Sequence, residues 1–432
     1  MDHPEEKSLR RDIGFFGSAF LSFNGVVGAG IFALPATLYT QFGAFSPWLF
    51  PLFGALVLIV AYPFSRLAAY HLASGGPVMY TAAFGPLVSF QIGWIYYVAR
   101  STALAANSNV FVTYAASLWA PLAEGLPRVL AIVTLCGTLT FVNIVGVKRA
   151  IRALDALTIL KATPLLIFAI WALISFGEAV PAPGPLPELS GIEAAALLVF
   201  YAFVGFENSV VPAGETADPR RTIPRALITT LVATMTLYFL VQLAYVAVMP
   251  RGAGGDAPLV EFGTRLAGPL GGLILTAAAL FSLTGNIMGG LTATPRTTFA
   301  LARDGLLPAW FGRVSERFAT PANSVLFMGV LTTLLALSGS FVWLAVVSTL
   351  ARMIVYSASI AALPGTRRRA AEGRAGPAIW FPVAAALAVC GWAASQSEWP
   401  SWRMLLALVA VGTMLYVAAR LAAVRQAPVP PQ

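Results

Sequence analysis

The chain has 432 residues, of which 58% are hydrophobic and only 10% carry a charged side chain. A water-soluble core cannot enclose that much apolar surface, so the composition excludes a soluble globular protein and predicts one held in a lipid bilayer. The formal net charge of +9 at pH 7 is spread over short basic clusters between apolar stretches. This distribution is typical of loops at a membrane surface, so no nucleic acid is expected as a partner.

The first residues and the two cysteines add little chemistry. Residues 1–12 are charged, and the apolar span after them is too long for a cleaved signal peptide, so we expect a cytoplasmic N-terminal tail. Cys136 and Cys390 lie inside apolar runs without metal-ligand or disulfide spacing, and are interpreted as small buried hydrophobic residues. The sequence therefore predicts no metal site and no cofactor.

Apolar runs between proline, glycine and charged residues give twelve candidate transmembrane helices, since a helix needs ~20 largely apolar residues to cross a bilayer. They lie at roughly 13–39, 46–70, 86–117, 129–147, 153–176, 191–215, 226–249, 266–300, 323–338, 341–364, 377–396 and 401–424. The end of the eighth run leaves open a continuation as a cytoplasmic helix. We expect an all-α polytopic membrane protein with about 12 transmembrane helices.

Lysine and arginine residues are distributed unequally between the loops on the two sides. With twelve spans both termini lie on one side, whose loops hold nineteen of these residues, whereas the opposite loops hold four. Cytoplasmic loops carry the excess of basic residues in multi-pass proteins. We therefore expect a protein of the inner (plasma) membrane with both termini in the cytoplasm.

Two of the runs contain glycine near the middle of the membrane. The first run reads Gly-Val-Val-Gly-Ala-Gly-Ile-Phe from Gly25 to Phe32, and the sixth reads Tyr-Ala-Phe-Val-Gly-Phe-Glu from Tyr201 to Glu207. Small residues also serve close helix packing, but the first and sixth of twelve helices are equivalent in two inverted five-helix repeats, which favours interrupted helices. Unwound backbone at that depth lines a polar cavity, where a helix N-terminus binds a carboxylate and free carbonyls accept from an ammonium. Such a cavity suits a zwitterionic amino acid.

The same residues resemble the first and sixth helices of the amino acid–polyamine–organocation (APC) transporters. Further motifs resemble this family in the same order: Ser74-Gly75-Gly76-Pro77, Ala213-Gly214-Glu215, Asp218 to Ala226, and Pro295 to Pro308. The resemblance implies a LeuT-like 5+5 inverted repeat plus two peripheral helices, with the substrate between helices one, three, six, eight and ten. The repeats would cover 13–176 and 191–364, followed by two helices within 377–424 and a cytoplasmic tail at 425–432.

The resemblance also implies which atoms hold the substrate. The backbone amides of Gly28, Ala29 and Gly30 would bind its carboxylate, and carbonyls at both breaks would bind its amino group. Tyr201 would close the pocket on its outer side, while Ala29 lacks the hydroxyl that many members carry at that place. The candidate substrate-binding residues are Val26, Val27, Gly28, Ala29, Gly30, Tyr201, Phe203, Val204 and Gly205.

Lys161 lies about nine residues, or ~14 Å at 1.5 Å per residue, from the cytoplasmic start of the fifth run. That distance is long for a side chain that snorkels to the interface, so a charge there invites a functional role. Proton-coupled APC members carry a lysine at the matching place, where its ammonium resembles a substitute for the sodium ion of sodium-coupled relatives. Because an apolar cavity disfavours a charged amine, opening and closing of the cavity would drive proton uptake and release. Lys161 is therefore the coupling candidate, and a proton is the expected co-substrate.

Three further ionisable residues fall inside predicted spans. Glu207 follows the sixth-helix break and is interpreted as a latch to the first or tenth helix, with proton binding as the alternative. Arg100, on the third helix, either pairs with Glu207 or another buried acid, or contacts an anionic substrate side chain. Arg352, with Tyr356 one turn later on the tenth helix, is expected to serve packing and gating.

The sequence predicts a secondary active transporter, or permease, that moves an amino acid or related amine by proton symport through alternating access. An exchanger or a sodium-coupled protein of the same fold is the alternative. The only histidines are His3 and His71 and no phosphate-binding loop motif is present, so neither an enzyme nor an ATP-driven pump is expected. A channel or sensor on the same fold would be distinguished by current or signalling without stoichiometric uptake.

Overall fold

The structure, a computed structural model, describes residues 11–71, 76–146, 148–369 and 377–426. Within these ranges every regular element is a helix, and the one β-type contact is an isolated bridge between Ile13 and Thr216. The predicted tails at 1–12 and 425–432 fall largely outside the described residues.

The helices follow one another along the chain with short links. The α-helices are α1 (Phe15–Val26), α2 (Ala29–Phe42), α3 (Leu49–Tyr70), α4 (Pro77–Thr81), α5 (Pro86–Ala116), α6 (Gly125–Val145), α7 (Lys148–Phe176), α8 (Leu189–Phe203), α9 (Pro219–Val248), α10 (Pro258–Ala293), α11 (Pro295–Arg303), α12 (Ala322–Ser338), α13 (Phe341–Ala361), α14 (Leu363–Arg369), α15 (Pro377–Ser395) and α16 (Trp399–Gln426). The 3₁₀ helices are η1 (Gly43–Trp48), η2 (Ala82–Phe84), η3 (Ala120–Ala123), η4 (Gly177–Ala179), η5 (Phe206–Ser209), η6 (Ala213–Glu215) and η7 (Ala309–Gly312).

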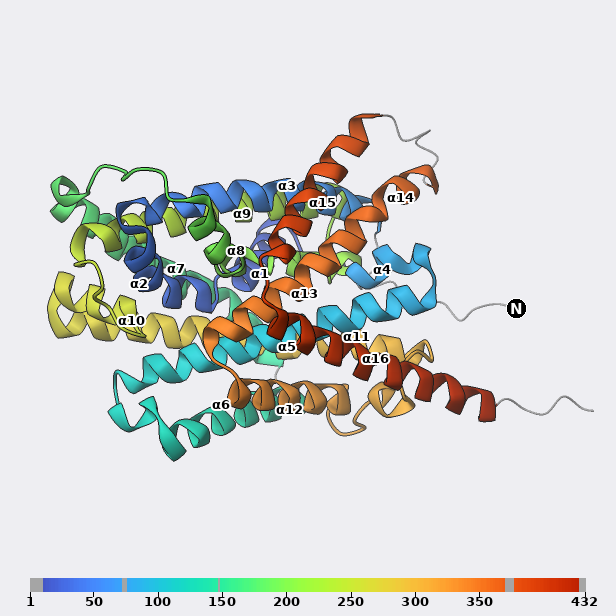
Figure 1. The fold of residues 1–432 in the computed structure, drawn as a ribbon. Coiled ribbons are helices and arrows are strands. Elements are labelled where there is room, and N and C mark those ends of the chain that lie inside the picture. The colour runs from blue at the N-terminus through green and yellow to red at the C-terminus, as the bar shows by residue number, and fades with distance from the viewer. Residues whose placement is uncertain (1–10, 72–75, 147, 370–376, 427–432) are drawn as a thin grey trace, which may run out of the picture.

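The membrane-spanning character of the chain is visible in these helices. Eight helical segments of the described residues are long and apolar enough to cross a membrane, and three shorter apolar helices accompany them. Each of the predicted apolar runs coincides with a helix or with helical pieces joined at a break. The predicted fold class is therefore confirmed: the protein is an all-helical polytopic membrane protein. The helices α11, α14 and the end of α16 lie at one end of the molecule, and η1 and η3 lie at the other (Figure 1).

Some predicted helix boundaries were wrong. The helix α9 begins at Pro219 rather than near residue 226, because proline fits the first turn of a helix and the exposed, basic residues after it lie beyond the apolar stretch. The sixth run was expected to be helical over 191–215, but α8 ends at Phe203. Only the 3₁₀ helices η5 and η6 follow it, so the second half of this run is not an α-helix.

The predicted eighth run, 266–300, is divided differently from expectation. The helix α10 already begins at Pro258 and changes direction at Ala267 and Gly268, where Gly268 has a left-handed φ of 65°. It ends at Ala293, and α11 follows as a separate short helix. A separate short helix therefore continues the eighth run, and its place on the cytoplasmic side stays a prediction.

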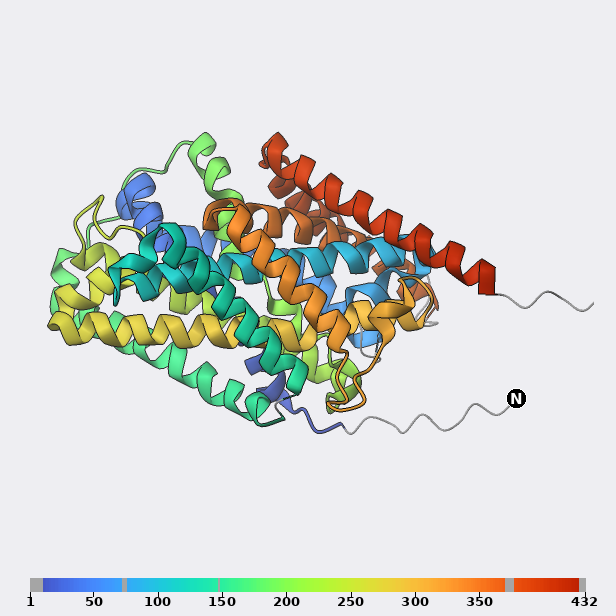
Figure 2. The same cartoon turned by 90° about the horizontal axis from the view of Figure 1, so that it is seen from below.

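The helix α5 runs through the middle of the bundle (Figures 1 and 2). It packs against α13, α10 and α12, and most of its residues are buried. Unlike the eight segments above, α5 is too polar to qualify as a membrane span by composition, since its central turns carry Arg100, Asn107 and Asn109. Protein rather than lipid surrounds this part of the helix, which is where polar side chains are tolerated at membrane depth.

The two interrupted helices cross beside α5. The hydroxyl of Ser22 on α1 donates to the carbonyl of Phe206 in η5 at 2.7 Å. Just before α1, the amide of Ile13 donates to the Glu215 carbonyl at 3.0 Å, and the amide of Ala217 donates to the Ile13 carbonyl at 2.8 Å. The first helix and the segment after the second break are therefore joined at two levels.

Candidate functional site

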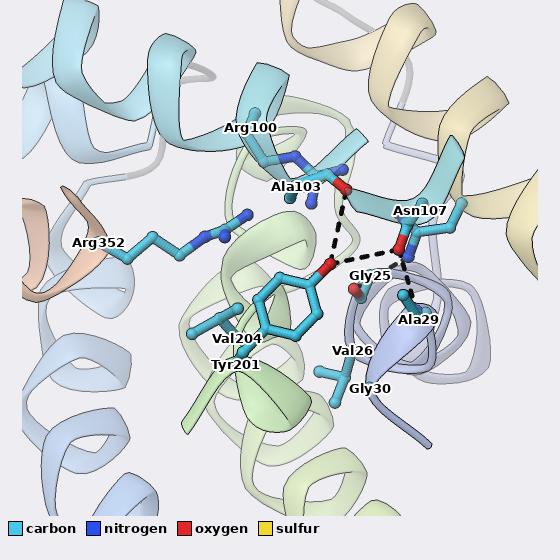
Figure 3. A pocket seen from close by; sticks show the side chains of 12 residues that line it. Gly25, Val26, Ala29, Gly30, Arg100, Ala103, Asn107, Tyr201, Val204 and Arg352 are labelled. Atoms are coloured by element: carbon cyan, nitrogen blue, oxygen red, sulfur yellow. Dashed lines mark hydrogen bonds between the residues drawn. The ribbon is translucent and has the colours of Figure 1, made fainter. Parts of the chain in front are cut away.

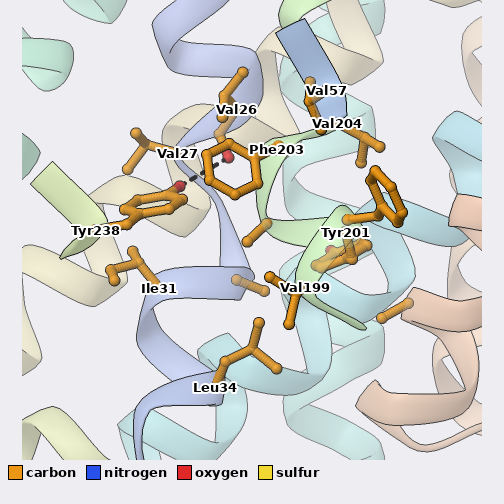
Figure 4. Packing of buried hydrophobic residues seen from close by; sticks show 14 of the residues in the cluster. Val26, Val27, Ile31, Leu34, Val57, Val199, Tyr201, Phe203, Val204 and Tyr238 are labelled. Carbon is orange, nitrogen blue, oxygen red and sulfur yellow. Dashed lines mark hydrogen bonds between the residues drawn. The ribbon is translucent and has the colours of Figure 1, made fainter. Parts of the chain in front are cut away.

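The first break lies between α1 and α2 at Val27 and Gly28. Val27 has φ −77° and ψ 89°, and Gly28 has φ −129° and ψ −143°, so neither residue is helical. The amide of Gly28 donates to the Val26 carbonyl at 2.9 Å, which closes a tight turn between the two helices. Apolar side chains surround this turn, among them those of Ile31 and Phe203 (Figure 4).

Side chains from other helices bind the carbonyls that the break exposes. The Val26 carbonyl accepts from the Tyr238 hydroxyl at 3.2 Å (Figure 4). The Val27 carbonyl accepts from the Lys161 ammonium at 3.0 Å and from the Ser282 hydroxyl at 3.4 Å. Of the carbonyls at both breaks that the resemblance assigned to the substrate amino group, those of Val26 and Val27 thus already have a donor from the protein, which satisfies the polar groups of the first break.

A chain of amide side chains reaches from the start of α2 back to α1. The Ala29 amide donates to Asn107 Oδ1 at 2.9 Å, and Asn107 Nδ2 donates to Asn286 Oδ1 at 2.8 Å. Asn286 Nδ2 in turn donates to the carbonyls of Asn24 at 2.7 Å and Gly25 at 3.1 Å. Sequence reasoning missed Asn107 and Asn286, although an amide inside a transmembrane run is itself a signal of a polar contact between helices.

The second break lies at Val204 and Gly205. Val204 is extended with ψ 149°, and Gly205 has a left-handed φ of 112°, a conformation that glycine adopts without the steric cost of a Cβ. The Glu207 carboxylate folds back over this break, where its Oε2 accepts from the Gly205 amide at 2.9 Å. The Glu207 carboxylate therefore satisfies a backbone amide that the break in its own helix leaves without a helical acceptor.

Glu207 also ties this break to α13. Its Oε1 lies 3.1 Å from Arg352 Nε in an ion pair, and its Oε2 accepts from the Tyr356 hydroxyl at 2.8 Å. Arg352 Nη1 donates to Ser348 Oγ at 2.6 Å. The predicted pairing of Arg100 with Glu207 is wrong: among the residues that the structure describes, the ion pair of Glu207 is made with Arg352. Geometry explains this result, because the two side chains that bind Glu207, Arg352 and Tyr356, lie one turn apart on α13 and reach the carboxylate together.

Arg100 lies on α5 with 3% of its surface exposed. Its side chain and that of Arg352 approach the same space near Tyr201 from two different helices (Figure 3). Within the described part of the chain, Arg100 has no acidic partner within ion-pair distance, and its buried Nε has no hydrogen-bond partner. The alternative pairing of Arg100 with some other buried acid is therefore wrong as well for these residues.

The two breaks and these arginines surround one small cavity. Its volume, about 10 Å³, is close to the minimum that holds one water molecule. Its lining comes from both interrupted helices and from α5, α10 and α13: Gly25, Val26, Gly28, Ala29, Gly30, Arg100, Ala103, Asn107, Tyr201, Val204, Asn286 and Arg352. The structure thus brings most predicted site residues together, whereas Val27, Phe203, Gly205, Glu207 and Lys161 lie behind this lining.

Tyr201 crosses the cavity from α8 toward α5. Its hydroxyl lies 3.3 Å from Asn107 Oδ1 and 3.5 Å from the Ala103 carbonyl oxygen (Figure 3). Its ring packs edge-on against Phe341 at the start of α13, with 5.7 Å between ring centroids. The side chain of Tyr201 is thus held between α5 and the start of α13, and its role in closing the cavity stays a prediction.

Lys161 is completely buried where α7 meets α1. Its Nζ lies 2.8 Å from Asn24 Oδ1, 3.0 Å from the Val27 carbonyl oxygen and 3.4 Å from the Asn24 carbonyl oxygen. No acid of the described ranges lies within ion-pair distance of it. Because Ser282 of α10 also donates to the Val27 carbonyl, Lys161 stands at the junction of α1, α7 and α10.

Comparison with known proteins agrees with this geometry. A family model described as "Amino acid permease" matches residues 13–400. An uncharacterized transporter of Mycobacterium tuberculosis is 32% identical over 353 residues, which cover 78% of this chain and 75% of that protein. A branched-chain amino acid permease of Bacillus subtilis is 28% identical, over 95% of this chain and 93% of that protein. A cadaverine/lysine antiporter of Escherichia coli is 26% identical, over 76% of this chain and 75% of that protein. The chain therefore belongs to the amino acid permease family of the APC superfamily, whose named relatives here are membrane transporters.

Proposed function

We propose that this protein is a secondary active transporter that carries an amino acid or a related amine across the inner membrane by alternating access. The observation that carries the proposal is the cavity at the crossing of the two interrupted helices, with the N-terminus of α2 on one wall and the second break on the other. Two inverted repeats, at 13–176 and 191–364, would place the two breaks at equivalent positions. A cavity of about 10 Å³ must widen before it admits an amino acid, which fits a transporter that opens to one side at a time.

The amino-acid head group would bind through backbone. The first amides of α2 lack intrahelical acceptors and carry the positive end of the helix dipole, so a carboxylate is favoured at Ala29 and Gly30. The Ala29 amide now donates to Asn107, so binding would exchange this bond for one to the substrate. The carbonyls of Phe203 and Val204, beside the cavity, would accept from the ammonium.

We further propose that protons drive transport and that Lys161 couples them to the first helix. A protonated amine has three N–H groups, and three oxygen acceptors lie within 3.4 Å of Lys161 Nζ. A neutral amine has only two N–H groups, so loss of the proton would weaken the contact between α7 and the Asn24–Val27 segment of α1. A sodium ion at ~4 Å from the ammonium would be repelled by ~4 kcal/mol at an effective dielectric constant of about 20.

An exchanger is the second candidate, because one relative is named an antiporter for cadaverine and lysine. An exchanger needs a substrate on both sides and gains nothing from an ion gradient, whereas a symporter accumulates substrate against its own gradient. Uptake with and without internal substrate separates the two.

The test is uptake by purified protein in liposomes, with an amino acid and amine panel, under an imposed pH gradient, an imposed sodium gradient, or neither. We expect uptake of an amino acid that follows the pH gradient, and loss of this dependence in Lys161→Gln with counterflow retained. The Lys161→Arg variant, which keeps the charge, controls for packing. Uptake that needs sodium and ignores the pH gradient would refute the coupling; no binding of any amino acid or amine would refute the function.

A further inference from the structure

The buried charge of Arg100 has no ion-pair partner among the residues that the structure describes. Across the described ranges Arg100 donates no hydrogen bond, although a guanidinium carries five N–H groups in a planar fork. It is 3% exposed and lines the cavity rather than packing behind it. Burying a charged side chain without a partner costs free energy. A buried, unpaired charge beside a cavity is therefore a candidate to bind an oppositely charged ligand.

The surrounding side chains leave this charge uncompensated. Arg352 is neutralised by Glu207, whose carboxylate accepts from Arg352, Tyr356 and the Gly205 amide. The other groups that interact electrostatically with Arg100 are the hydroxyls of Tyr96 and Tyr201, which are neutral. The cavity therefore carries one net positive charge, and nothing in its described lining carries an unpaired negative one.

Arg100 is also separated from the α2 N-terminus. Along α5, Asn107 lies seven residues after Arg100 on the same helix face. Along α10, Gly290, where an added Cβ would lie 3.1 Å from Arg100 Nη2, comes one turn after Asn286. At 1.5 Å per residue, the backbone positions in these two pairs are about 10 Å and about 6 Å apart along their helix axes. A ligand with two anionic groups joined by a short carbon chain, each group making a hydrogen bond of about 3 Å, can span such a separation.

We propose that the substrate carries a second negative charge and belongs to the dicarboxylic amino acids, with Arg100 as the residue that binds the side-chain carboxylate. The inference rests on the proposed function and names its substrate class. A zwitterionic head plus a side-chain carboxylate has a net charge of −1, which cancels the charge of Arg100. A guanidinium also suits a carboxylate geometrically, because it offers two parallel N–H groups. Cationic substrates, such as lysine and diamines, are repelled by the same charge.

The test compares matched substrates. Binding to the purified protein is measured for L-glutamate and L-aspartate, for their isosteric amides L-glutamine and L-asparagine, and for L-lysine. We expect the acids to bind about 10- to 100-fold more tightly than the amides, because an amide loses the charged hydrogen bond to Arg100. Lysine should not bind. Equal affinity for an acid and its amide, or preference for a neutral or basic amino acid, overturns the inference while leaving amino-acid transport intact.

The variants Arg100→Gln and Arg100→Lys test the residue itself. Arg100→Gln should lose the preference for the acids and keep the affinity for the amides, and Arg100→Lys should keep a reduced preference. Arg296→Gln, on the exposed side of α11, is the matched control and should bind as the wild type does. If Arg100→Gln does not fold, the affinities of Arg100→Lys and of the wild type for the same substrates still test whether Arg100 binds the side-chain carboxylate. Unchanged acid preference in a folded Arg100→Gln protein overturns the role of Arg100.

Discussion

Gly25 and Gly205 pack backbone against backbone where the two interrupted helices cross. A Cβ added at Gly25 would collide with the Gly205 carbonyl oxygen and the Asn208 side chain, and one added at Gly205 would collide with the backbone of Gly25 and Val26. Gly205 also has a φ of 112°, which residues with a Cβ rarely adopt. The close approach of the two breaks, on which the cavity depends, therefore requires glycine on both sides.

We predict that Gly25→Ala and Gly205→Ala separate the two breaks and abolish substrate binding. Overpacking costs about 1–3 kcal/mol at such sites, so a lower melting temperature should accompany the loss. Gly137→Ala, on the exposed face of α6 with nothing within 4 Å of the added Cβ, is the control. It should leave substrate binding unchanged and should not lower the melting temperature, since alanine favours a helix more than glycine does. Normal binding by Gly205→Ala would show that the crossing tolerates a wider spacing.

The ion pair between Glu207 and Arg352 predicts a stability effect. Glu207→Gln removes the negative charge and leaves the Arg352 guanidinium buried without a counter-charge, which costs about 3–5 kcal/mol when one partner of a buried pair is removed. Thermal unfolding in detergent should show a clear loss. The double variant Glu207→Gln/Arg352→Met removes both charges and should recover part of that loss. A Glu207→Gln melting temperature equal to that of the wild type contradicts this account.

Asn107 is predicted to control access of an anion to α2. Asn107→Asp keeps the size of the side chain but places a negative charge 2.9 Å from the Ala29 amide, where the substrate carboxylate is proposed to bind. Repulsion of ~4 kcal/mol at ~4 Å and a dielectric constant of about 20 should weaken binding by at least about 100-fold. Asn143→Asp, on α6 outside the cavity lining, is the control. Unchanged affinity in Asn107→Asp would remove the α2 amides from the substrate site.

The orientation of the chain is predicted from its basic residues. The basic groups of α11 and α14, which include Arg303 and the run Arg367–Arg369, lie at the same end of the molecule as the end of α16 (Figure 1). That end should face the cytoplasm, together with both termini. A C-terminal fusion to a fluorescent protein that folds only in the cytoplasm should fluoresce. A C-terminal fusion to a phosphatase that is active only in the periplasm should be inactive. The reverse pattern would show that the loop bias does not set the orientation.

Sequence patterns located the helices and the two breaks because both depend on local residues. Apolar runs mark spans, and the glycines at 25, 28 and 205 mark places where a helix is interrupted. Partners could not be assigned in the same way. Glu207 and Arg352 are 145 residues apart, and Asn107 and Asn286 are 179 apart. Which of two arginines meets an acid depends on how α5 and α13 are rotated and packed, and a single sequence does not contain that information.

The polarity of α5 has a consequence for how the chain enters the membrane during synthesis. A segment with Arg100 at its centre partitions poorly into lipid, since an arginine there costs at least ~2.5–3.5 kcal/mol. The most extensive contacts of α5 are made with α10, α12 and α13, which are synthesised much later. Between those events, α5 depends on the apolar helix α6 that follows it directly. The nascent chain should therefore insert α5 and α6 as a hairpin, and a chain truncated just after Ala116 should integrate poorly.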